Sequence, residues 1–102
     1  MAEVVTLVTG YVEPDRVAEV AETYRKALQG GTPPDLEETF LLTGSEGRVG
    51  VLSVWYRRAD LDAMLASGEE PFARRLIRNA GGTPEVAIYD IVVRATGEVG
   101  QP

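Results

Sequence analysis

The chain has 102 residues, with 10 basic and 16 acidic side chains and a formal net charge of −6 at pH 7. This length predicts a single domain covering residues 1–102, and the acidic balance argues against a nucleic-acid partner. The sequence contains no cysteine and no histidine, which excludes disulfides, thiolate nucleophiles and metal sites ligated by either residue. We therefore expect no metal and no other cofactor. Since no apolar run approaches about 18 residues and no signal peptide is recognisable, we expect no membrane contact and a cytoplasmic location.

The first elements are a strand followed by a helix. Residues 3–12 alternate with apolar side chains on both faces, which predicts a central strand. A helix then begins with Asp15 as its N-cap and carries an apolar stripe from Val17 to Leu28. Gly30 and the residues after it end this helix.

The middle of the chain predicts a β-hairpin. Residues 36–43 form a second strand, and the adjacent Glu37 and Glu38 suit an edge position, where charge discourages unwanted pairing. The turn at residues 44–47 joins it to a strand over residues 48–58. This third strand also has two apolar faces, so it belongs in the middle of a sheet.

Two helices and a last strand follow. A short helix begins with Asp60 as its N-cap, and Leu65 and the other apolar residues of this helix are predicted to face the core. A second helix runs over residues 71–80. Residues 85–94 form the last strand. The tail, residues 95–102, is expected to be flexible or to lie on a partner.

The order of these elements predicts an α+β, ferredoxin-like fold: a split βαβ (βαββαβ) with an antiparallel four-stranded sheet. Both strands with two apolar faces are central in that topology, and the helices can cover only one face. The uncovered face would expose a large apolar surface. We therefore expect a symmetric homodimer with the two sheets packed face to face as a dimeric α+β barrel. The residues of that face are Val5, Leu7, Leu52, Val54 and Tyr56.

Residues 51–76, VLSVWYRRADLDAMLASGEEPFARRL, resemble the strand–helix signature of the antibiotic biosynthesis monooxygenase family. The matching features are an apolar residue and Trp55 at the strand end, two polar residues, a short helix with two spaced leucines, Ser67, and a second helix that begins near Phe72. The resemblance implies a dimeric α+β barrel with a small-molecule pocket between sheet and helices. Some members of the family oxygenate polycyclic phenols without a cofactor; others degrade haem, isomerise signalling molecules or have no known activity.

The chain departs from the family at two positions that matter for chemistry. Better-studied members use an asparagine beside the tryptophan, whereas here Val51 lies four residues before Trp55. Haem-degrading members use a histidine, and this chain has none, so haem ligation of that kind is excluded. Asn79 falls near the end of a helix, where closing the helix is its more common role.

The resemblance also implies a set of substrate-binding residues. They are Trp55, Ser53, Val51, Val8 and Phe72. Trp55 would stack on a flat aromatic ligand, although it could equally serve only as a core residue. Ser53 shares its strand face and could offer a hydroxyl to the ligand, or bond only to backbone.

Two residues of the last strand are the candidate catalytic groups. Asp90 interrupts an apolar run, and an inward carboxylate there would be desolvated and suited to act as a base. The alternatives are an outward position or an ion pair across the dimer with Arg57, Arg58 or Arg94. Tyr89 is expected beside the pocket, where a phenol can hold a ligand oxygen or relay a proton.

The resemblance implies a cofactor-independent monooxygenase, an oxidoreductase that acts on an aromatic, polyketide-type small molecule. Two alternatives stay open. One is a non-catalytic dimeric barrel that binds a hydrophobic small molecule or assists a biosynthetic enzyme. The other is an isomerase or cyclase built on the same fold.

Overall fold

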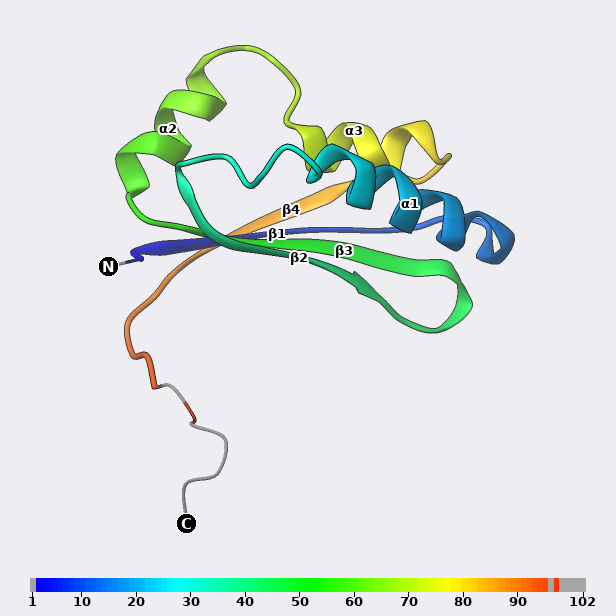
Figure 1. Cartoon of the computed structure of the whole chain (residues 1–102), viewed down its shortest axis with the longest axis horizontal. Helices are drawn as coiled ribbons and strands as arrows, with labels where there is room; N and C mark the ends of the chain where they lie inside the picture. The colour runs from blue at the N-terminus through cyan, green and yellow to red at the C-terminus, as the bar shows by residue number, and fades with distance from the viewer. Residues whose placement is uncertain (1, 96, 98–102) are drawn as a thin grey trace.

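The computed structural model describes residues 2–95 and 97. Helices cover one face of a four-stranded antiparallel sheet, and the other face is uncovered (Figure 1). In chain order the elements are β1 (Val4–Tyr11), the 3₁₀ turn η1 (Pro14–Arg16), α1 (Val17–Ala27), β2 (Leu36–Thr43), the 3₁₀ turn η2 (Ser45–Gly47), β3 (Arg48–Trp55), α2 (Arg58–Ala66), α3 (Phe72–Asn79) and β4 (Glu85–Asp90). Within the described residues, no helix is both long enough and apolar enough to cross a membrane.

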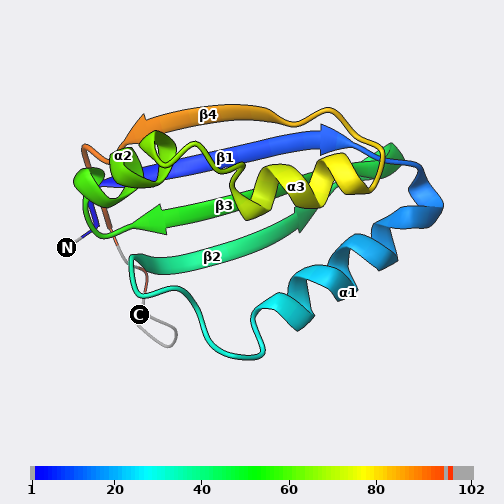
Figure 2. The same cartoon turned by 90° about the horizontal axis from the view of Figure 1, so that it is seen from above.

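The strand order is β2-β3-β1-β4, so β1 and β3 are central and β2 is an edge strand. This is the predicted α+β, ferredoxin-like topology. Seen from above the helices, α3 runs over β1 and β3 while α1 lies along the β2 side (Figure 2). The two strands with apolar residues on both faces occupy the centre because only a central strand buries both faces.

Strand alternation decides which side chains the helices cover. On β1, Val4, Thr6 and Val8 are buried, whereas Val5 and Leu7 point to the uncovered face and are only half-buried. The covered face holds two apolar clusters. The larger lies under α1 and α3 and includes Val8, Val20, Tyr24, Val49, Val51, Leu76 and Ile77. The smaller lies under α2 and consists of Val4, Trp55 and Leu61, with Leu36 and Met64 packed against it.

We call the uncovered side of the sheet the open face. Strand register shows that its members come from all four strands. The apolar and aromatic ones are Val5, Leu7, Tyr11, Phe40, Leu42, Leu52, Val54, Ala87 and Tyr89. Tyr56, which the sequence predicts for this face, follows the last residue of β3 and is 41% exposed. Several of the open-face residues are substantially exposed, including Tyr89 at 58% and Leu42 at 46%. A contiguous apolar surface of this kind is unusual on a monomer.

Both predicted N-caps are wrong. The turn η1 precedes α1, which begins at Val17, and no side chain caps either element, so Asp15 is not a cap. Asp60 lies within the first turn of α2 and accepts hydrogen bonds from the Arg57 guanidinium at 3.2 and 3.3 Å.

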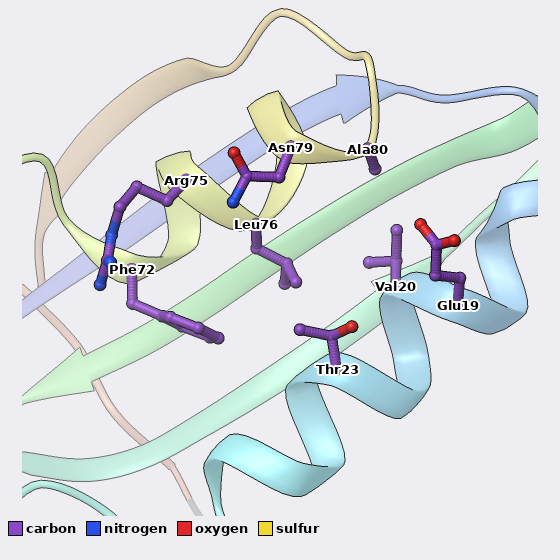
Figure 3. Close-up of a pocket in the computed structure, with 8 residues that line it drawn as sticks. All are labelled: Glu19, Val20, Thr23, Phe72, Arg75, Leu76, Asn79 and Ala80. Atoms are coloured by element: carbon purple, nitrogen blue, oxygen red, sulfur yellow. The ribbon is translucent and has the colours of Figure 1, made fainter.

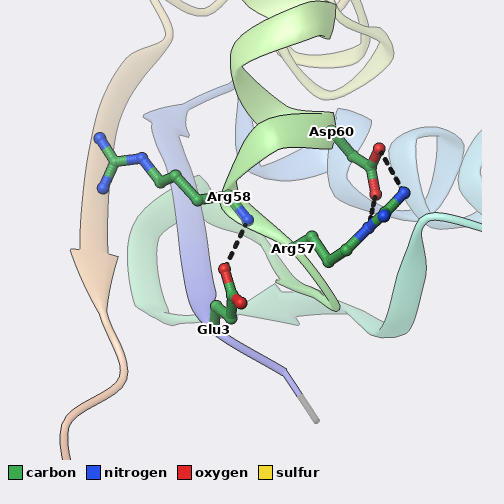
Figure 4. A network of polar contacts seen from close by, with 4 residues as sticks. All are labelled: Glu3, Arg57, Arg58 and Asp60. Carbon is green, nitrogen blue, oxygen red and sulfur yellow. Dashed lines mark hydrogen bonds and ion pairs between the residues drawn. The ribbon is translucent and has the colours of Figure 1, made fainter.

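The start of α2 is capped instead by a residue far away in sequence. The backbone N–H of Arg58 donates to a carboxylate oxygen of Glu3 at 3.0 Å (Figure 4). A carboxylate at this position satisfies a helix donor and interacts favourably with the helix dipole. Further along α2, Leu61 is fully buried but Leu65 is 38% exposed, so the inward orientation predicted for Leu65 is wrong.

The strands predicted to reach Arg58 and Arg94 are shorter than expected. β3 ends at Trp55 because β1, the strand it pairs with, begins at Val4 and offers no further strand backbone beyond that point. β4 ends at Asp90 for the same reason, with one further bond from the Ile91 N–H to the Glu3 carbonyl oxygen at 2.9 Å.

The chain beyond β4 crosses the end of the sheet toward β2 (Figure 2). Arg94 there forms an ion pair with Glu37 at 2.5 Å. Glu37 sits at a β-bulge, because the pairing with β3 skips it between Leu36 and Glu38. The predicted tail, 95–102, falls mostly outside the described residues.

Candidate functional site

A cavity of about 420 Å³ lies between the helices and the covered face of the sheet. This volume is within the range of roughly 300–1,000 Å³ that is typical of small-molecule pockets. Its walls come from α1, the loop after α1, β2, β3, α2 and α3. The lining residues are Tyr24, Ala27, Leu28, Gly31, Pro33, Asp35, Leu36, Thr39, Val51, Ser53, Trp55, Met64, Phe72 and Ala73.

The structure brings together four of the five predicted substrate-binding residues. Val51, Ser53 and Trp55 project from alternate positions of β3 into the cavity, and Phe72 lies at the start of α3 on another wall. Val8 does not line it. It is paired with Val51 in the β1–β3 register and belongs to the apolar cluster under α1 and α3.

Trp55 is both a core residue and a wall of the cavity. Only 7% of its surface is exposed, and it packs with Val4 and Leu61. Its indole N–H donates to the Thr6 hydroxyl oxygen at 3.1 Å, and Thr6 is buried as well. The hydrogen-bonding edge of the indole is therefore satisfied by β1, and the apolar ring is left to contact whatever occupies the cavity.

Three hydroxyl groups form a chain along one side of the cavity. The Tyr24 hydroxyl bonds to the Thr39 hydroxyl at 2.5 Å, and the Thr39 hydroxyl bonds to the Ser53 hydroxyl at 3.0 Å. Burial raises the pKa of the Tyr24 phenol, and the hydrogen bond with Thr39 opposes that rise. Tyr24 is therefore a neutral phenol throughout the physiological pH range.

The rest of the lining is mostly apolar. Among the described residues that line the cavity, Asp35 alone is charged, and it is exposed at the edge of the loop before β2. An anionic ligand would find no basic residue among the described lining residues, and a cationic ligand would find only Asp35 at the exposed edge, so a charge deeper in the cavity would lose its hydration without a partner. The cavity thus suits an uncharged, largely apolar molecule with few hydrogen-bonding groups.

The two predicted catalytic residues lie away from this cavity. Asp90 is the last residue of β4, its side chain is 70% exposed, and it pairs with Arg58 of the same chain at 2.8 Å. The burial that would make it a base is absent because the strand ends there. Tyr89 pairs with Val5 and points to the open face, on the opposite side of the sheet from the cavity.

A second, smaller hollow of about 100 Å³ lies between α1 and α3 (Figure 3). Val20 and Leu76 form its floor, and Asn79 lies at its rim. Asn79 is the last residue of α3 and is exposed; its backbone carbonyl oxygen accepts a bond from Arg16 at 3.4 Å. This hollow is too small for an aromatic ligand, and Asn79 acts there as a helix-terminating residue.

Sequence reasoning missed Thr39. Simple alternation from Leu36 would place Leu36 and Glu38 on one face and Thr39 on the other. The bulge at Glu37 resets that alternation, so that Leu36 and Thr39 both face the helices, opposite Trp55 and Ser53. Paired glutamates at an edge are a weak signal for such a bulge, and nothing else in the sequence indicates it.

Comparison with known proteins gives relatives by structure only. No family model matches the sequence, and no curated protein is significantly similar to it. A protein of unknown function from Nitrosomonas europaea superposes with a TM-score of 0.71 at 17% identity, covering 96% of this chain and 97% of the other. A putative antibiotic biosynthesis monooxygenase from Caulobacter crescentus superposes with a TM-score of 0.65 at 20% identity, covering 90% and 92%.

A third similar structure is SnoaB from Streptomyces nogalater, described as a cofactor-independent oxygenase and solved as an asparagine-to-alanine mutant. It superposes with a TM-score of 0.60 at 16% identity, covering 97% of this chain and 98% of the other. At these identities the likeness establishes a shared fold along nearly the whole chain. The resemblance to antibiotic biosynthesis monooxygenases read from the sequence is thus confirmed at the level of the fold.

Proposed function

We propose that this protein binds a flat, uncharged aromatic molecule in the cavity beside Trp55 and oxygenates it without a cofactor. The observation that carries the proposal is the lining itself: an aromatic ring on each of two walls, Trp55 and Phe72, with hydroxyls as the polar groups inside. Such a lining offers an aromatic ligand stacking contacts and few polar groups. Solved structures of the same fold include one described as a cofactor-independent oxygenase, which supports the reaction type.

The chemistry needs no external reductant when the substrate is a fused-ring ketone with a reactive methylene, such as an anthrone. Loss of a methylene proton to solvent water places the electron pair on the ketone oxygen as an enolate. The enolate carbon then bonds to O₂, and the peroxide anion formed takes a proton back from water to give a hydroperoxide. The hydroperoxide loses water to leave a second ketone. Overall CH₂ plus O₂ gives C=O plus H₂O, so the substrate supplies all the electrons.

The first experiment uses Trp55, the sole tryptophan of the chain, as the probe. Saturable quenching of its fluorescence by anthracene at micromolar concentration is the expected result. As a control, Ala73→Phe places a larger ring in the cavity and should abolish quenching, with far-ultraviolet circular dichroism to check that the variant is folded. Oxygen consumption with anthrone then tests the reaction. Absence of quenching in the unaltered protein would refute the proposal.

A second candidate function is a non-catalytic binding protein. It is favoured by the lack of a buried base, because Asp35 is the cavity's one carboxylate within the described residues and it is exposed. Binding of anthracene without oxygen uptake from anthrone would favour this alternative. A changed product formed without oxygen uptake would favour an isomerase or cyclase.

We also propose that two copies of the chain pack their open faces together. The reason is the apolar character of that face, which extends over all four strands and includes Phe40 at 41% and Tyr89 at 58% exposure. The same residues on both copies would form the self-complementary interface of a two-fold dimer. Sedimentation velocity at micromolar concentration is the test, and a monomeric mass would refute it. The cytoplasmic location stays a prediction.

A further inference from the structure

The three hydroxyl groups along the cavity have one more O–H hydrogen than the hydrogen bonds between them use. Tyr24, Thr39 and Ser53 each carry one O–H hydrogen, and the two bonds between them use two. Within residues 2–95 and 97, none of the three hydroxyls has a further hydrogen-bond partner. One O–H is therefore available inside a mostly apolar cavity, where an unsatisfied donor is costly.

The direction of the chain decides which residue carries that O–H. The geometry allows either hydroxyl of the Tyr24–Thr39 pair, 2.5 Å apart, to donate. Because a phenol is a stronger acid than an alcohol, Tyr24 is the favoured donor to Thr39. A hydroxyl that accepts a hydrogen bond becomes a better donor, which favours a chain running in one direction. Thr39 then donates to Ser53, and the O–H of Ser53 is the one that remains.

Ser53 lies two residues before Trp55 on the same face of β3, and both line the cavity. A flat ligand stacked on the Trp55 ring would bring its edge to Ser53. We propose that the Ser53 hydroxyl is a specificity-determining donor, which gives a hydrogen bond to a carbonyl oxygen of the ligand and so favours a ligand with a carbonyl group over one of the same shape without it. This assignment rests on the function proposed above, because it requires an aromatic ligand against Trp55.

The same hydrogen bond would favour the reaction as well as binding. When the methylene C–H of a bound ketone breaks, the proton leaves to solvent water and the electron pair moves onto the ketone oxygen. A donor already aimed at that oxygen stabilises the growing negative charge more strongly than the neutral ketone. Ser53 would then act as an oxyanion-stabilising donor, and Thr39 and Tyr24 would be positioning residues that polarise it.

The test compares two uncharged ligands of the same ring skeleton, anthraquinone with carbonyl oxygens and anthracene without them. The dissociation constant of each is measured from Trp55 fluorescence for the unaltered protein, Ser53→Ala and Tyr24→Phe. Thr43→Val is the matched control, because Thr43 is on β2 with Thr39 but does not line this cavity. The readout is the dissociation constant of anthraquinone divided by that of anthracene. A change in the shape of the cavity affects both ligands and therefore cancels in this ratio.

We expect Ser53→Ala to raise this ratio about threefold to tenfold, the effect of one neutral hydrogen bond. Tyr24→Phe should raise it less, and Thr43→Val should leave it unchanged. Ser53→Ala should also lower the rate of oxygen uptake with anthrone at saturation.

If anthracene still binds but Ser53→Ala leaves the ratio within twofold, the role of Ser53 is wrong and the aromatic cavity stands. If Tyr24→Phe raised the ratio more than Ser53→Ala, the hydrogen-bond chain would run in the opposite direction. The assignment of Ser53 as the donor to the ligand would then be wrong. If neither ligand binds the unaltered protein, the proposed function fails together with this inference.

Discussion

The hydrogen bond between the Trp55 indole and Thr6 allows a quantitative test of how the cavity wall is held. Thr6→Val replaces the hydroxyl with a methyl of nearly the same volume, so it creates no cavity. The indole N–H, which donates at 3.1 Å in the structure, is then left without its acceptor. Because Thr6 is 8% and Trp55 7% exposed, water has little access to replace it.

An unsatisfied buried donor costs about 1–3 kcal/mol, so we expect Thr6→Val to lower the free energy of unfolding by that amount. For a chain of this length, each kcal/mol corresponds to roughly 4–8 °C in the melting temperature. Urea denaturation followed by far-ultraviolet circular dichroism measures the change. All variants are compared at one protein concentration, since a dimer would make the apparent stability depend on concentration.

The same substitution in a Trp55→Phe background separates this effect from general packing. Phenylalanine has no N–H, so Thr6→Val should then cost less than about 0.5 kcal/mol. Thr9→Val is the matched control on β1, because Thr9 faces the open side of the sheet. Equal costs in the two backgrounds, or a cost within about 0.5 kcal/mol in the unaltered protein, would show that the bond does not hold Trp55.

Three further predictions concern the rest of the fold. Leu52→Lys places a charge on the open face and should shift the protein to a monomer in sedimentation velocity; an unchanged dimer would mean that another surface forms the interface. Hydrogen bonds from Arg94 lower the pKa of Glu37, so this carboxylate stabilises the folded state above its unfolded pKa and loses that effect as the pH falls through its folded pKa. The stability difference between the unaltered protein and Arg94→Ala should therefore shrink between about pH 5 and about pH 2, and a difference independent of pH would contradict the pairing. Gly47→Ala should destabilise by at least about 2 kcal/mol, because φ is +83° and a Cβ there would lie 1.9 Å from the Val12 carbonyl oxygen; a normal urea midpoint would be inconsistent with this turn.

The covered and open faces of the central strands could be predicted because they depend on local alternation alone. Val51, Ser53 and Trp55 are separated by two residues each, and any strand through them must place all three on one side. That is why these three residues of one short segment line the cavity together. Val8 also faces the helices but does not line the cavity, because the residues packed around it leave no space beside it.

Contacts between distant segments could not be predicted in the same way. Glu3 caps α2 at Arg58, 55 residues later, because β1 begins beside that helix in the folded sheet. Asp90 is exposed because β1 starts too late to extend its pairing, and Tyr89 faces away from the cavity because of its register with Val5. Each outcome depends on where a neighbouring strand begins, which the local pattern does not contain.

The sequence by itself determined the order of the elements, the central positions of β1 and β3, the apolar open face and the shared face of Val51, Ser53 and Trp55. These features follow from the periodicity of side chains along each strand and helix. Only the tertiary structure decided that Thr39 joins Tyr24 and Ser53 in one chain of hydroxyls. The physical reason is the bulge at Glu37: a single extra residue reverses the face of every later residue on β2, and its position is set by pairing with β3.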